Sequence, residues 1–157
     1  MKDIIIIGAG IGGLTLALTL HRSGIPCRVY EAAPEVKGLG LGINILPHAT
    51  RELAELGLED ALAAVAVATR EAVFYNRFGQ LVYSEPLGHH AGHDWPQFSI
   101  HRGDLQAVLL EACSRRIGAD RIFTGWRCAR VEQDGDGAMV HFNSSATGET
   151  LPPQRGA

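Results

Sequence analysis

Four closely spaced glycines near the N-terminus constrain the fold more than any other feature of the chain. They occupy positions 8, 10, 12 and 13, between the apolar run Ile4–Ile7 and a second apolar stretch that begins at Leu14. Each glycine in a helix costs about 0.5–1 kcal/mol relative to alanine, so residues 1–20 do not fit a signal peptide or a membrane span. The four isoleucines instead predict a central parallel strand that is buried on both faces. The segment after the glycines has helical periodicity and a stop at Gly24.

The glycines form the pattern G-x-G-x-x-G at Gly8, Gly10 and Gly13, with Gly12 inside it. In a dinucleotide fold the first glycine allows a tight turn, the second lets a pyrophosphate approach the backbone, and the third lets the helix pack against the sheet. The N–H groups of the helix N-terminus stabilise the negative charge of that pyrophosphate. The sequence therefore predicts a dinucleotide-binding turn, where a plain glycine-rich turn would be the alternative.

A second strand is predicted at residues 25–30 and ends at Glu31, about 20 residues after the glycines. A carboxylate at this position accepts hydrogen bonds from the hydroxyls of an adenosine ribose and repels a 2′-phosphate. The order strand, glycine turn, helix, strand and acid makes the motif more specific than the glycines alone.

Composition excludes several other classes of protein. The chain has 157 residues, 46% of them hydrophobic, with 14 basic and 17 acidic side chains, which indicates a globular domain without affinity for nucleic acid. The three cysteines form no C-x-x-C pair, so neither a disulfide framework nor a zinc site is indicated, and a cytoplasmic location is expected. His89, His90 and His93 resemble metal ligands in spacing, but no carboxylate or cysteine completes a site, and no metal is predicted.

The middle of the chain departs from the usual nicotinamide-binding order. The glycines of segment 38–42 suggest a backbone held near a ligand, although a flexible surface loop is an alternative. A helix is expected around residues 48–56, extended by helical residues 61–67, and a β-hairpin is expected at residues 73–83.

Arg102 lies directly before a predicted helix over about residues 103–116. A cation at a helix N-terminus opposes the macrodipole unless an anion such as a phosphate lies nearby. The alternative is a surface ion pair with Asp104 or Glu111. Strands are then expected at residues 121–123, 126–133 and 138–142, with a turn at 134–137 joining the last two.

Four ordered blocks of the sequence resemble the single-component FAD-dependent aromatic monooxygenases. The blocks are Gly8-Ala-Gly-Ile-Gly-Gly13, Tyr30-Glu-Ala32, Gly40-Leu-Gly-Ile-Asn-Ile45 and Ser99-Ile-His-Arg-Gly-Asp-Leu-Gln106. Residues 83–86 and 95–102 look most like the phenazine-carboxylate monooxygenase branch. The resemblance runs from Met1 to about Asn143.

The resemblance implies an α/β, Rossmann-like FAD-binding fold with a parallel central sheet and β-hairpin excursions. It implies that Gly12 and its neighbours meet the pyrophosphate, and that Glu31 binds the adenosine ribose with Ala32 beside it. Asn44 would lie on a loop facing the flavin, and Arg102 would contact the phosphate and ribitol. The backbone at Cys128 would border the adenine.

The chemistry implied by the resemblance uses FAD as cofactor and NAD(P)H as co-substrate. The reduced flavin and O2 hydroxylate a small aromatic substrate, while protein groups orient the ring and exclude water. No catalytic residue is predicted, because the cofactor performs the difficult step. Neither a membrane nor a nucleic acid is an expected partner.

The family resemblance also implies an incomplete domain. Two further flavin motifs and the substrate sheet are missing, so residues 1–157 are expected to be the N-terminal part of an FAD-binding domain, with a central sheet open to self-association at its edge. As an isolated fragment it is expected to bind FAD weakly and to turn over no substrate. The alternatives are a non-catalytic NAD- or ADP-binding module, for which Gly8–Glu31 would suffice, and a truncated product without independent function.

Overall fold

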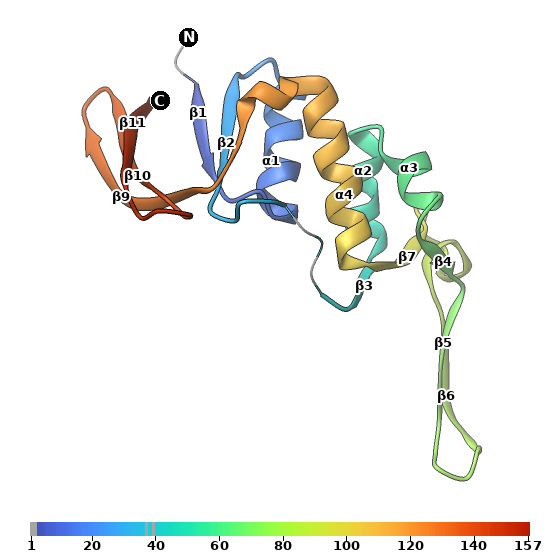
Figure 1. Ribbon diagram of the computed structural model, residues 1–157. Coiled ribbons are helices and arrows are strands. Elements are labelled where there is room, and N and C mark those ends of the chain that lie inside the picture. Colours follow the sequence, from blue (N-terminus) through green and yellow to red (C-terminus); the bar gives the residue numbers. More distant parts are fainter. Residues whose placement is uncertain (1–2, 37, 39) are drawn as a thin grey trace. The chain divides into compact units, whose positions relative to one another are not determined.

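The structure is a computed structural model that describes residues 3–36, 38 and 40–157 (Figure 1). The chain divides into two compact units, the first formed by residues 1–38 and 106–157 and the second by residues 39–105. Mixed parallel and antiparallel sheets with packed helices confirm the α/β class predicted from the sequence.

The first unit is built on a parallel sheet in the order β1-β2-β8, formed by Ile4–Ile7, Cys27–Glu31 and Ile122–Thr124. Helix α1 (Ile11–Arg22) connects β1 to β2 and buries Leu14, Ala17 and Leu18. Strand β2 is buried at Val29 and Tyr30, as expected for the middle strand of a covered parallel sheet. The predicted order of strand, glycine turn, helix and strand is therefore present.

A second, antiparallel sheet in the same unit has the order β11-β10-β9. Its strands are β9 (Trp126–Asp134), β10 (Gly137–Ser144) and β11 (Thr150–Gly156). Tyr30 stacks on Phe123 and Phe142 with ring centroids 4.7 and 4.6 Å apart, and Trp126 packs at an angle to all three rings. This aromatic cluster joins the antiparallel sheet to β2.

Arg28 adds a polar connection between the two sheets. Its guanidinium donates to Gln154 Oε1 at 2.7 Å and to the carbonyl of Arg155 at 2.9 Å. It also lies 3.2 Å from the carboxylate of Asp3, which Arg121 approaches to 3.0 Å. The start of β1 and the end of β11 are thereby tied to β2.

The second unit contains a three-stranded antiparallel sheet in the order β3-β7-β4, formed by Gly42–Ile45, Gln97–His101 and Val67–Thr69. Helices α2 (Pro47–Glu55) and α3 (Glu59–Ala63) follow β3. Ile45, Phe98 and Ile100 are buried on one face of the sheet, whereas Val67 is 68% exposed on the other face.

Strands β5 (Glu71–Tyr75) and β6 (Leu81–Pro86) form the predicted hairpin. In Figure 1 it extends away from β4 and β7. Phe74, Tyr75, Phe78 and Tyr83 are all more than half exposed. A short 3-10 helix, η1 (Gly88–Ala91), follows the hairpin.

The boundary between the units passes through helix α4 (Arg102–Cys113). A π-helical turn, η2 (Ser114–Gly118), and a 3-10 turn, η3 (Ala119–Arg121), lead to β8. Cys113 is fully buried, and its thiol donates to the carbonyl of Leu14 at 3.3 Å, which holds the end of α4 against α1.

Several boundaries differ from those predicted. The helical extension over residues 61–67 is wrong beyond Ala63, because β-branched Val67 pairs with β7 as part of β4. Strand β11 was not predicted, because Pro152 and Pro153 within it are poor strand formers. It lies at the edge of its sheet, where a missing N–H is tolerated.

Candidate functional site

The glycine turn between β1 and α1 has the backbone that the sequence predicts. Gly8 has φ +105°, which a residue with a side chain rarely adopts. A Cβ on Gly13 would collide with the carbonyl oxygen of Gly8 and lie 3.3 Å from Ile6 Cγ2. A Cβ on Gly10 or Gly12 would meet no atom within 4 Å. Gly13 thus permits close packing of helix on strand, while the space over Gly10 and Gly12 is open.

The carboxylate of Glu31 lies at this turn. Its Oε2 accepts a hydrogen bond from the backbone N–H of Ala9 at 2.7 Å, and its Oε1 accepts one from Ala33 N–H at 2.7 Å. Glu31 ends β2, whose pairing with β1 brings the ends of both strands to the same edge of the sheet. Each carboxylate oxygen keeps acceptor capacity for a further donor such as a ribose hydroxyl.

The N-terminus of α1 has no side chain as a cap. Gly10 is the N-cap, and only its carbonyl is used, by Leu14 N–H at 3.0 Å. No acidic residue lies in the first turn. The first N–H groups of a helix have no partner within the helix, so this end is suited to an anion.

Gln106 was not identified from the sequence as a site residue. Its Nε2 donates to the carbonyl of Ala9 at 2.9 Å, and Ala9 is completely buried. The amide of Gln106 therefore holds the turn from the side of α4. No local pattern in the sequence indicates this contact, because Gln106 and Ala9 are 97 positions apart.

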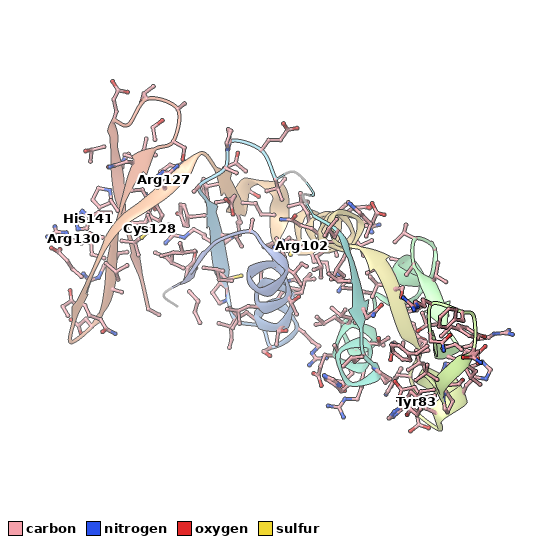
Figure 2. All side chains as sticks on the ribbon, turned by 90° about the horizontal axis from the view of Figure 1, so that it is seen from below. Tyr83, Arg102, Arg127, Cys128, Arg130 and His141 are labelled. Atoms are coloured by element: carbon pink, nitrogen blue, oxygen red, sulfur yellow. The ribbon has the colours of Figure 1, made fainter. Side chains whose placement is uncertain are left out.

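Ala32 and Cys128 are also in the first unit. Ala32 follows Glu31 in the bend after β2 and is half-buried. Cys128 lies on β9 opposite Phe142, beside an irregularity in the register, and packs against the aromatic cluster (Figure 2). The predicted residues Gly8–Gly13, Glu31, Ala32 and Cys128 thus all belong to one compact unit.

Asn44 lies in the second unit, on strand β3 and not on the loop that the resemblance implied. The loop prediction is wrong because residues 42–45 pair in register with β7. The Ser99 hydroxyl donates to Asn44 Oδ1 at 2.6 Å from the directly opposite position. Of the glycine-rich stretch before β3, position 39 lies outside the described residues.

Arg102 lies where β7 passes into α4, and it is exposed (Figure 2). A Cβ on Gly40, which has φ +129°, would lie 3.1 Å from Arg102 Cδ, so the stem of the arginine packs close to this glycine. Glu111 pairs with Arg115 at 3.3 Å. Within residues 3–36, 38 and 40–157, no ion pair of Arg102 with Asp104 or Glu111 is formed, so the surface-pair alternative is not supported.

The histidine-rich segment lies around η1. His89 Nδ1 is 3.0 Å from the carbonyl of His93. In the described part of the chain, no three histidine, cysteine or acidic side chains are grouped as metal ligands would be.

The buried thiols are poor nucleophiles. Burial raises the pKa of Cys113 to about 12, and burial also raises the pKa of Cys27. Both residues lie in the core of the first unit, and neither takes part in the glycine turn.

None of the helices in the described ranges is long and apolar enough to cross a membrane.

Comparison with known proteins identifies the family. Residues 1–153 match the family described as FAD binding domain. The chain belongs to this family, which confirms the resemblance found in the sequence.

Two curated relatives are similar to most of this chain. Phenazine 1,6-dicarboxylic acid hydroxylase of Lysobacter antibioticus is 46% identical over 147 residues, which are 93% of this chain and 36% of that protein. 3-Amino-4-hydroxybenzoate 2-monooxygenase of Streptomyces cremeus is 37% identical and is matched over 88% of this chain and 35% of its own length. The chain thus spans about a third of the length of these relatives.

Solved structures agree with the fold. Klebsiella pneumoniae HpxO in complex with FAD and uric acid is 31% identical with a TM-score of 0.77, over 99% of this chain and 37% of that one. p-Nitrophenol 4-monooxygenase from Pseudomonas putida has a TM-score of 0.86 at 19% identity, over 99% of this chain and 39% of its own, and shows the fold alone.

Proposed function

We propose that the first unit binds the ADP half of FAD at the glycine turn. The diphosphate lies at the N-terminus of α1, and the adenosine ribose donates its hydroxyls to Glu31. Ala32 and the backbone of Cys128 border the nucleoside. As the family resemblance implies, Arg102 is proposed to supply a cation to the phosphate and ribitol of FAD.

The observation that carries this proposal is the hydrogen bond from Ala9 N–H to Glu31 Oε2. It holds a carboxylate at the edge of a turn whose glycines leave open space, directly before a helix without a side-chain cap. An anion site and a hydroxyl acceptor are thereby fixed next to each other, as the two parts of a nucleotide require.

We further propose that the chain is the N-terminal part of the FAD-binding domain of an NAD(P)H-dependent aromatic hydroxylase. When bound, FAD supplies the redox chemistry by which one atom of O2 enters the ring and the other leaves as water. The role of this chain is to bind and orient the cofactor. Relatives named for 3-amino-4-hydroxybenzoate, urate and 6-hydroxynicotinate support an oxygen-bearing aromatic substrate.

The test is nucleotide titration of the chain, followed by flavin absorbance and calorimetry. FAD is expected to bind in preference to NAD. Glu31→Ala is expected to weaken FAD by about tenfold or more, because one to two hydrogen bonds to ribose hydroxyls are lost. Arg102→Ala is expected to weaken it less, and Arg77→Ala, an exposed arginine in the hairpin turn, is the matched control. An affinity unchanged by Glu31→Ala would refute the proposed site.

A non-catalytic NAD- or ADP-binding module is the second candidate. It is favoured by one observation: the turn and Glu31 lie within a single compact unit. Equal or tighter binding of NAD than of FAD, with no effect of Arg102→Ala, would select this candidate.

A cytoplasmic location and self-association through the sheet edge belong to the same proposal. In the described sheet β1 is an edge strand that pairs with β2, and directly before its first residue the carbonyl of Asp3 accepts from Ala157 N–H at 3.0 Å. Such an edge presents unpaired N–H and C=O groups. Sedimentation velocity over a range of concentrations tests this point, and a monomer throughout the range would contradict it.

A further inference from the structure

A second polar site lies on the exposed face of sheet β3-β7-β4, in the second unit. Gly42 lies opposite His101, while Asn44 and Val67 both lie opposite Ser99. Directly opposed residues, and residues two apart along a strand, share one face of a sheet. These five residues therefore lie on the same face, which is not the face that buries Ile45, Phe98 and Ile100.

This face is hollowed. A cavity of about 410 Å³ is lined by this set together with Ile43, Val65, Ile100 and Asp104. Gly42 contributes no side chain to this hollow, and its apolar lining includes Val65 and Val67, which are 47% and 68% exposed, together with Ile43 and Ile100. A volume of this size is at the lower end of the range of about 300–1,000 Å³ for small-molecule sites.

Two hydrogen bonds determine which atoms of Asn44 and His101 remain as hydrogen-bond donors in the hollow. Ser99 donates to Asn44 Oδ1 at 2.6 Å, which leaves the two N–H groups of Asn44 Nδ2 as donors. Gly103 N–H donates to His101 Nδ1 at 3.2 Å, so the neutral ring carries its proton on Nε2 and also offers a donor. Within the described part of the chain, Nδ2 and Nε2 have no acceptor.

Asp104, in the first turn of α4, adds an acceptor to the same lining. Two donors and one carboxylate, beside the apolar side chains of Val65 and Val67, complement a planar ring whose edge presents carbonyl oxygens next to a ring N–H. A simple carboxylate edge would suit the hollow less well, because Asp104 would repel it.

We propose that this hollow binds the edge of an oxo-heteroaromatic substrate ring, with Asn44 and His101 as recognition residues and Ser99 as the positioning residue of Asn44. The proposal rests on the aromatic hydroxylase function above. It assigns Asn44 to the substrate and not to FAD.

The test is a titration of the ¹⁵N-labelled full chain with 6-hydroxynicotinate, whose ring carries a carbonyl beside an N–H. The side-chain NH2 signals of Asn44 and the backbone signal of Gly42 are expected to shift. The N-methyl analogue lacks the N–H that faces Asp104 and is expected to bind at least fivefold more weakly. Lumiflavin, which carries the flavin ring without ribityl or phosphate, is the competing probe.

Variants separate positioning from a general structural effect. Asn44→Asp replaces donors with acceptors and is expected to weaken binding about tenfold or more. Ser99→Ala frees the amide to rotate and is expected to weaken binding about fivefold. Ser84→Ala, the same change on the hairpin, is expected to have no effect, and the spectra show directly whether each variant is folded.

Three outcomes would overturn the proposal: no response of Asn44 to 6-hydroxynicotinate, tighter binding of lumiflavin at the same signals, or equal effects of Ser99→Ala and Ser84→Ala. A parallel titration with ADP, monitored at the backbone signals of Ala9 and Gly12, tests the nucleotide site independently. Shifts there without any response at Asn44 would leave the proposed function standing and refute only the ring site.

Discussion

Replacing Gly13 with alanine is expected to push helix α1 away from strand β1. The new Cβ would collide with the Gly8 carbonyl oxygen, lie 3.1 Å from the Gly8 carbonyl carbon and lie 3.3 Å from Ile6 Cγ2. The first two atoms are backbone, so no side-chain rotation relieves the contact. Overpacking costs about 1–3 kcal/mol, and we expect the upper part of this range, about 2–3 kcal/mol, because the contact is with backbone.

Replacing the neighbouring Gly12 with alanine is a matched control, for which we expect a change in the free energy of unfolding of the opposite sign. Gly12 lies in the same helical turn, and a Cβ there would meet no atom within 4 Å. Gly12→Ala should therefore stabilise the fold by up to about 1 kcal/mol through helix propensity. Gly13→Ala has the same favourable effect on helix propensity but also the steric cost, so its free energy of unfolding should fall by about 1–2 kcal/mol.

The assay is urea unfolding followed by far-UV circular dichroism, without added nucleotide. The two variants should differ in free energy of unfolding by about 2–3 kcal/mol, and in melting temperature by about 4–10 °C for a domain of this size. Equal changes in the two variants, or a Gly13→Ala variant as stable as the original chain, would refute the account of the turn.

Three further predictions concern the core of the first unit. Because burial raises the pKa of Cys113 from 9.0 to about 12, the unfolded chain loses this thiol proton first, so stability should fall as pH rises above about 9, by up to about 1.4 kcal/mol per pH unit. Urea unfolding at pH 8 and 10 checks this, and a Cys113→Ala variant with the same pH slope would contradict it. Cys128 is only partly buried whereas Cys27 and Cys113 are buried, so a thiol reagent at pH 8 should modify Cys128 first, and Cys128→Ser should remove the fast phase. Phe142→Ala should cost about 3–5 kcal/mol, because its fully buried ring stacks in the aromatic cluster, while the control Phe78→Ala, 72% exposed in the hairpin turn, should change stability by less than about 0.5 kcal/mol. Thermal unfolding of both phenylalanine variants measures the difference.

Local patterns in the sequence are sufficient to predict the nucleotide-binding motif. Four isoleucines, a glycine turn and a periodic helix determine β1 and α1 through interactions between near neighbours, so their bounds could be predicted closely. Glu31 could be placed because parallel strands align their carboxyl ends at one edge. The hairpin of β5 and β6 was likewise predicted from its turn residues.

Features that depend on distant pairing could not be predicted. Strand β3 cannot be predicted locally, because its pairing with β7 joins residues more than 50 positions apart. The hydrogen bonds of Gln106 with Ala9 and of Ser99 with Asn44 also bridge distant segments, and no local pattern encodes them. Side-chain amides and hydroxyls acquire a direction only when the tertiary fold brings their partners together.

The two amide hydrogen bonds to Glu31 also affect how fast a ligand is captured. A carboxylate held at both oxygens loses its rotational freedom when the chain folds, so none remains to be lost when a sugar arrives. Encounter would then need no rearrangement of this side chain, and the association rate at the turn would be limited by diffusion and orientation of the nucleotide.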